Sequence, residues 1–137
     1  DRKDARAGAK ALIQTSRSLE KGFSVVFFPE GTRSKDGRLL RFQDGPFRIA
    51  LKKGVPVLPI VVEGTGKLLT RNSLLFSNHS LFRIRILDPV QTAGGEWADA
   101  GALRDAVHQR MQSALDAMTA GSDVPRAERP VQSLAAY

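Results

Sequence analysis

Two short apolar runs constrain the fold of this chain more than any other feature of its sequence. Ser24–Phe28 is a run of small, β-branched and aromatic residues that ends at Pro29, and Val57–Val62 is a second run that Pro59 interrupts. Runs that are apolar at consecutive positions suit strands buried on both faces of a sheet. The proline inside the second run predicts an edge position or a bulge there.

Three segments around these runs have the spacing of apolar residues that is typical of helices. Asp4–Lys21 carries one apolar stripe, and a short helix is expected to begin at Pro46 and to close at Gly54. The clearest helix is predicted over Asp99–Ala120. Its stripe consists of Leu103, Val107, Met111, Ala114, Leu115 and Met118.

A third strand is predicted over Leu81–Leu87, where apolar and basic residues alternate so that Arg83 and Arg85 are expected to face outward. Strands separated by helices predict an α/β domain with a mixed, partly parallel sheet flanked by helices. We expect residues 1–120 to form this single domain, and the polar residues 121–137, which include two prolines, to form a flexible tail.

The charge distribution points to an anionic partner. The 137 residues carry a net charge of +7, and residues 1–53 hold 13 Lys and Arg against 6 Asp and Glu, whereas residues 54–137 hold 8 of each. A localised positive field favours a phosphorylated substrate, an anionic lipid surface or nucleic acid, and the alternative is a solvated basic face without a partner. With no cysteine and only two histidines, we expect no disulfide and no metal site.

The stretch with the clearest chemistry follows the first apolar run. Residues 30–33 read Glu-Gly-Thr-Arg and stand where a buried strand is expected to end, which is where open α/β sheets bind ligands. Gly31 lets the backbone approach a ligand closely, Thr32 offers a hydroxyl, and the planar guanidinium of Arg33 suits a phosphate. Glu30 is expected either to hold Arg33 or to accept from a substrate hydroxyl. The alternative is a surface turn in which the Glu30–Arg33 pair is only structural.

The sequence Phe-Pro-Glu-Gly-Thr-Arg-Ser at residues 28–34 resembles the third signature block of the glycerolipid acyltransferase family, to which bacterial 1-acyl-glycerol-3-phosphate acyltransferases belong. Three further stretches resemble the family in the same order along the chain. Asp1-Arg2 resembles the end of its second block, Arg41–Phe47 its Phe-x-x-Gly-x-Phe stretch, and Val55–Ile60 its fourth block. The resemblance covers roughly residues 1–92, and it implies the fold of the glycerol-3-phosphate acyltransferases, incomplete in this chain.

The family's first block, Asn-His followed by four residues and Asp, does not occur in this sequence. The two histidines, His79 and His108, are followed at that spacing by Ile84 and Ser113. We therefore interpret His79 as a loop residue and His108 as a flank of the last helix, and predict no catalytic residue in this chain. The chain is interpreted as the C-terminal part of an acyltransferase domain. It departs from the family at residues 43 and 44, where Gln and Asp replace a common lysine.

The resemblance implies transfer of an acyl group from acyl-CoA or acyl carrier protein to a lysophosphatidate-like glycerol phosphate in phospholipid synthesis. The substrate phosphate would be bound by Glu30, Gly31, Thr32, Arg33 and, from the second block, Arg2. No cofactor or metal is implied beyond the acyl donor as co-substrate. The expected location is the cytoplasmic face of a membrane with an anionic surface, reached peripherally or through an upstream segment.

A second reading of the sequence is a basic module that binds anionic membrane or nucleic acid without catalysis. Nucleic-acid readers usually interleave aromatic residues with basic ones so that bases stack on the rings. Here the aromatic residues near the basic segment are expected in strand or helix cores, so we expect no nucleic-acid partner; they are Phe23, Phe27, Phe28, Phe42 and Phe47.

Overall fold

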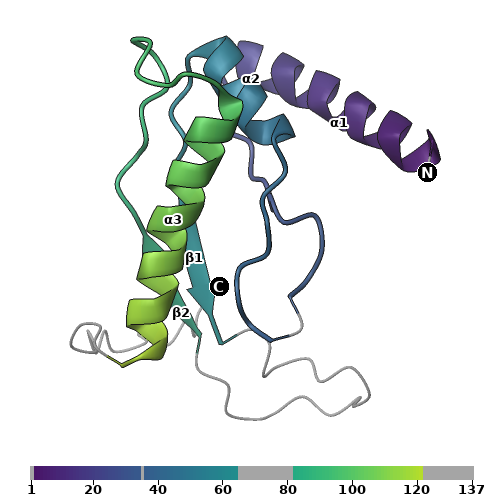
Figure 1. The fold of residues 1–137 in the computed structure, drawn as a ribbon. Coiled ribbons are helices and arrows are strands. Elements are labelled where there is room, and N and C mark those ends of the chain that lie inside the picture. The colour runs from purple at the N-terminus through teal and green to yellow at the C-terminus, as the bar shows by residue number, and fades with distance from the viewer. Residues whose placement is uncertain (1, 35, 65–81, 122–137) are drawn as a thin grey trace, which may run out of the picture.

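The computed structural model describes residues 2–34, 36–64 and 82–121. Within these ranges the chain forms three helices and two strands: α1 (Arg2–Glu20), α2 (Gly45–Lys53), β1 (Ile60–Glu63), β2 (Arg83–Ile86) and α3 (Ala100–Thr119). Figure 1 shows α3 lying along the two strands, α2 crossing near the start of α3, and α1 extending away from this unit. The predicted tail falls almost wholly outside the described residues.

All three helices lie where their apolar spacing predicts them. Asp99 begins α3 as an N-cap whose carboxylate accepts the Ala102 amide at 2.8 Å, which satisfies one of the otherwise unpaired amides of the first turn. Gly54 ends α2 in the left-handed conformation, and its amide donates to helix carbonyls. The side chain of Leu12 in α1 lies so close to Gly45 that a Cβ atom there would be 3.1 Å from it.

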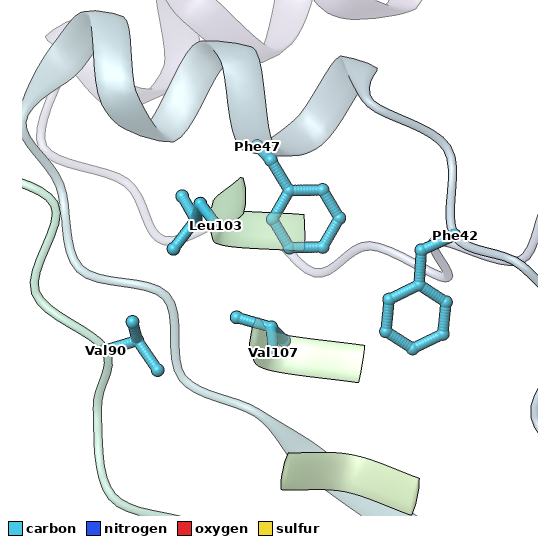
Figure 2. Close-up of a cluster of buried hydrophobic side chains, with 5 residues drawn as sticks. All are labelled: Phe42, Phe47, Val90, Leu103 and Val107. Atoms are coloured by element: carbon cyan, nitrogen blue, oxygen red, sulfur yellow. The ribbon is translucent and has the colours of Figure 1, made fainter. Parts of the chain in front are cut away.

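The core lies between α3, α2 and the segments beside them. Phe42, Phe47, Val90, Leu103 and Val107 form one buried cluster, and Figure 2 shows their side chains converging from four separate segments of the chain. A second cluster joins β1 to the last turns of α3. Every member of the predicted stripe of α3 is buried or half-buried in these clusters. The helix therefore packs as its period predicts.

The two strands pair antiparallel, with Ile60 opposite Ile86 and Glu63 opposite Arg83. Pro59 interrupts this pairing as predicted: an isolated bridge joins Val57 to Val90, and the regular ladder resumes only at Ile60. Proline has no amide hydrogen to donate, but its carbonyl still accepts the Leu87 amide at 3.0 Å. No parallel pair of strands occurs among the described residues, so the parallel part of the predicted sheet is not confirmed.

The prediction of a buried strand over Ser24–Phe28 is wrong for this structure. The segment is irregular, and the side chains of Val26 and Phe28 are 80% and 86% exposed. A strand requires a neighbouring backbone to complete its hydrogen bonds, and no strand within the described ranges pairs with this segment. The expected core positions of Phe23 and Phe28 are wrong for the same reason, whereas Phe42 and Phe47 are buried.

The orientation predicted for the third strand is also wrong. Arg83 lies on the same face as Val61 and Glu63, toward α3, and its guanidinium donates to the Met118 carbonyl at 2.6 Å. The last carbonyls of a helix lack partners within the helix, so a basic side chain is stabilised there. The opposite face carries the isoleucines, and Ile84 and Ile86 are 66% and 65% exposed. The face of β2 that carries Arg83 is thus the one that α3 packs on, through the cluster of Val61 with the last turns of the helix.

This arrangement leaves an open apolar face on the sheet, formed by Ile60, Val62, Ile84 and Ile86. We expect the chain to bind a hydrophobic dye such as anilinonaphthalene sulfonate before it unfolds, and to melt over a broad range of temperature. Replacing Ile84 and Ile86 together by threonine should lower dye fluorescence with little loss of thermal stability.

Val61 provides the matched control, because it lies in the same ladder but is buried against α3. Val61→Thr should lower stability by about 1–3 kcal/mol, since it places a hydroxyl in an apolar cluster. The two variants are compared by thermal unfolding and by dye titration. A sharp melt without dye uptake in the wild-type chain would contradict the expected exposure of this face.

Candidate functional site

The candidate site is the loop between residue 29 and α2, and its two ends lie side by side. The Gln43 amide donates to the Pro29 carbonyl at 2.8 Å, which closes the neck of the loop. The Gly31 amide donates to the Phe28 carbonyl at 3.1 Å and makes the first turn. These bonds hold residues 30–42 as a compact surface loop that carries the Glu-Gly-Thr-Arg motif at its start.

Glu30 acts inside this loop rather than on Arg33. Its Oε2 atom accepts the backbone amide of Leu40 at 2.7 Å, and the side chain is half-buried. No ion pair joins Glu30 to Arg33 in the described part of the loop. A charged acceptor makes a strong hydrogen bond to an amide. The carboxylate therefore anchors the loop at Leu40 instead of holding Arg33, and acceptance from a substrate hydroxyl stays a prediction.

Gly31 has a backbone conformation that favours glycine. Its φ is +69°, in the left-handed region that L side chains rarely adopt, and a Cβ atom at this position would lie 2.2 Å from the Gln43 side-chain nitrogen. Gln43, one of the departures from the family pattern, thus packs directly against the motif.

Thr32 and Arg33 remain available to a ligand. Both are exposed, and neither side chain makes a hydrogen bond or ion pair with any residue that the structure describes. Ser34 differs, because its hydroxyl donates to Asp36 Oδ1 at 2.9 Å. The same oxygen accepts the Arg38 amide at 3.2 Å. The bond from the Arg38 amide, and after it the bond from Ser34, lower the pKa of Asp36. Ser34 therefore stabilises a turn, and Thr32 and Arg33 stand before it.

Arg2, the other predicted phosphate contact, lies at the start of α1. The structure describes its backbone but not the position of its side chain, so its approach to the loop stays a prediction. His79 lies outside the described residues. Within the described ranges, no group of three histidine or acidic side chains is placed to hold a metal ion, and none of the helices described is long and apolar enough to cross a membrane.

Helix α3 contributes two residues to this site that the sequence analysis did not assign to it. Arg104 forms an ion pair with Asp44 at the end of the loop, and bonds to Asp105 and Asp44 raise its pKa. His108 approaches the Leu40 carbonyl, with Nε2 3.1 Å from the oxygen. The two residues are four apart and so share one face of α3. The sequence signal for these two residues is their spacing of four, each directly after a residue of the apolar stripe, which places both at the edge of the buried face of α3.

An open hollow of about 340 Å³ lies at the base of the loop, between it and α3. Arg33 does not line this hollow, so the exposed guanidinium and the hollow are separate features of the site. The lining residues are Glu30, Arg41, Phe42, Gln43, Asp44 and Arg104. The lining therefore contains both acidic and basic side chains, and two of them, Asp44 and Arg104, form an ion pair with each other.

The comparisons with known proteins fall on this part of the chain. Residues 1–63, which include α1, the loop and α2, match the family model described as Acyltransferase. Residues 1–63 belong to the acyltransferase family. The matched range contains every predicted phosphate contact of this acyltransferase segment, and it ends with β1.

Individual relatives extend the match beyond residue 63. A chloroplastic 1-acyl-sn-glycerol-3-phosphate acyltransferase of Brassica napus is 48% identical over 89 residues, which is 65% of this chain and 26% of that protein. The alpha enzyme of the same name from Mus musculus is 31% identical over 112 residues, 81% of this chain and 39% of that protein. The chain thus spans between a quarter and two fifths of these acyltransferases.

A solved structure supports the fold. The 1-acyl-sn-glycerophosphate acyltransferase PlsC from Thermotoga maritima superposes with a TM-score of 0.69 at 31% identity, over 80% of this chain and 44% of that protein. The helices and the small sheet described above therefore have the arrangement of part of an acyltransferase domain. More than half of the PlsC chain has no counterpart in these 137 residues.

Proposed function

We propose that this chain supplies the phosphate-binding part of an enzyme that transfers an acyl group to a lysophosphatidate-like acceptor in phospholipid synthesis. The acyltransferase family match and the names of the relatives support the reaction class. The observation that carries the proposal is the exposed guanidinium of Arg33, which has no partner among the described residues, on a loop whose two arms are bonded together.

The loop is built to present a cation in a fixed place. Glu30 and Gly31 shape the backbone, so Arg33 and the Thr32 hydroxyl extend from a short, constrained segment. A guanidinium can give two parallel hydrogen bonds to one phosphate, which orients the group as well as binding it. Arg41 is an exposed cation of the same loop and adds to its positive potential, whereas Arg38 is already paired with Asp36 at 4.0 Å; a positive potential favours a dianionic phosphate over a neutral head group.

Holding the phosphate would place the acceptor hydroxyl relative to the acyl donor. In the proposed reaction, a histidine paired with an aspartate takes the hydroxyl proton, and the hydroxyl oxygen attacks the thioester carbonyl carbon. The new ester bond forms as the carbon–sulfur bond breaks, and the thiolate leaves and takes up the proton. Neither histidine of this chain has the required aspartate, so the base belongs to residues outside these 137.

The acyl donor in this proposal is acyl-CoA or acyl carrier protein, and no cofactor takes part. We propose that the complete enzyme works at the cytoplasmic face of a membrane, where its lipid acceptor resides. The basic residues of the first 53 positions would favour an anionic surface there.

The test compares two acceptors that differ only in the phosphate. The complete enzyme containing this chain is assayed with lysophosphatidate and with monoacylglycerol of the same acyl chain, with acyl-CoA as donor. We expect kcat/KM to be at least about tenfold higher for the phosphorylated acceptor, because one hydrogen bond to a charged group contributes about 1.5–3 kcal/mol. Equal values would contradict phosphate recognition. Binding to anionic vesicles without turnover would favour the non-catalytic module.

A further inference from the structure

His108 holds the far arm of the loop against α3. It is half-buried, and its Nε2 atom lies 3.1 Å from the carbonyl oxygen of Leu40, 68 residues earlier in the chain. A carbonyl oxygen can only accept, so Nε2 carries the proton in this contact. The bond links the loop to the helix that forms the core of the described chain.

The imidazole ring is itself held in place by the aromatic part of the core. The Phe42 ring packs edge-on against it, with the ring centres 4.6 Å apart, and Phe42 in turn stacks with Phe47 at 6.2 Å. Both phenylalanines are buried. The direction in which His108 presents its Nε2 proton is therefore set by packing rather than by solvent.

Leu40 is consequently bound on both of its backbone groups. Its amide donates to Glu30 at the start of the loop, and its carbonyl accepts from His108 on α3. Arg33 lies in the sequence between Glu30 and Leu40, the two residues that this hydrogen bond joins. The clasp formed by Glu30, Leu40 and His108 therefore closes the segment that carries Arg33. Without His108 the Glu30–Leu40 hydrogen bond would still close the loop and Asp44 would still pair with Arg104, but Leu40 would lose its hydrogen bond to α3.

We propose that His108 is a positioning residue, which fixes the loop on α3 and thereby sets where Arg33 and Thr32 meet the acceptor phosphate. The inference rests on the proposed function. It assigns His108 no part in proton transfer, because its Nε2 proton is engaged by the Leu40 carbonyl. A loop held in its binding geometry loses less freedom when the ligand arrives, so the clasp should favour acceptor binding.

Two substitutions separate the hydrogen bond from the ring. In the complete enzyme, His108→Phe keeps a ring against Phe42 and removes the donor, whereas His108→Gln keeps an N–H donor. Gln109→Ala, at the exposed neighbour on the same helix, is the matched control. KM is measured for lysophosphatidate and for acyl-CoA separately, and amide hydrogen exchange is followed over residues 31–42.

We expect His108→Phe to raise the KM for lysophosphatidate about 3- to 10-fold, the range for loss of one ordinary hydrogen bond, with the KM for acyl-CoA unchanged. Amide exchange over residues 31–42 should become faster, His108→Gln should restore part of both effects, and Gln109→Ala should change neither. A His108→Phe enzyme that melts earlier but keeps the wild-type acceptor KM and loop exchange would overturn the proposal, since His108 would then only pack.

The exchange measurement separates this inference from the proposed function. If the wild-type enzyme does not prefer a phosphorylated acceptor, the proposed function fails, and a phosphate-positioning role for His108 fails with it even where His108 still orders the loop. If the preference is present and both His108 variants keep wild-type exchange and KM, the proposed function stands and the assignment of His108 is wrong.

Discussion

Replacing Arg33 by alanine in the complete enzyme is expected to lower kcat/KM for lysophosphatidate about 10- to 150-fold if one charged hydrogen bond is lost, and more if two are lost. The guanidinium is exposed and makes no ion pair with the described residues, so the change should remove the proposed phosphate contact and disturb little else. The melting temperature should stay close to that of the wild type. Steady-state kinetics with varied acceptor, and thermal unfolding, measure the two quantities.

Arg33→Lys should recover only part of the loss, because an ammonium keeps the charge but cannot make two parallel hydrogen bonds. Arg110→Ala is the control for net charge, since Arg110 is an exposed arginine on α3. The rival interpretation makes Arg33 a structural partner of Glu30, although Glu30 binds the Leu40 amide instead. An Arg33→Ala enzyme that melts early and keeps wild-type kinetics would support that rival interpretation.

The 137-residue chain by itself is expected to give no measurable acyl transfer. Neither histidine has an aspartate five residues later, and a positioned general base contributes on the order of 10²- to 10⁴-fold to such a reaction. The purified chain is assayed with lysophosphatidate and acyl-CoA against a blank without protein.

The complete enzyme, prepared and assayed in the same way, is the positive control. Mutating the histidine of the proposed His-x4-Asp pair should abolish the activity of the complete enzyme, which would show that the assay reports the proposed base. Clear turnover by the 137-residue chain would contradict the assignment of the base to residues outside it. Such turnover would also require a new interpretation of His79, which lies outside the described residues.

The helices could be predicted well because their signals are local. The stripe of α3 repeats every three to four residues over five turns, and Asp99 and Gly54 are chemically suited to begin and end helices. The interruption of the ladder at Pro59 was predictable for the same reason, since proline has no amide hydrogen to donate to a ladder. These features depend on residues close together in the chain.

The strands were predicted less well because a strand depends on its neighbours. Ser24–Phe28 has the composition of a buried strand, but no described strand pairs with it. The alternation in β2 correctly indicated two faces, yet it did not indicate which face is covered. That depended on where α3 packs: its last turns cover the face of Val61, and on that face the Met118 carbonyl accepts from Arg83. The alternation of residues within the strand does not show that a helix carbonyl 35 residues later in the chain will lie beside Arg83.

The sequence by itself determined the helices, the loop that follows residue 29 and the chemical character of its Glu-Gly-Thr-Arg motif. The family match over residues 1–63 agrees with the family that this motif indicated. The tertiary structure alone decided how the motif is held: Glu30 binds Leu40 instead of Arg33, and His108 completes the clasp from α3. The physical reason is that hydrogen bonds to backbone groups follow from proximity in space, and backbone groups are the same at every position of a sequence.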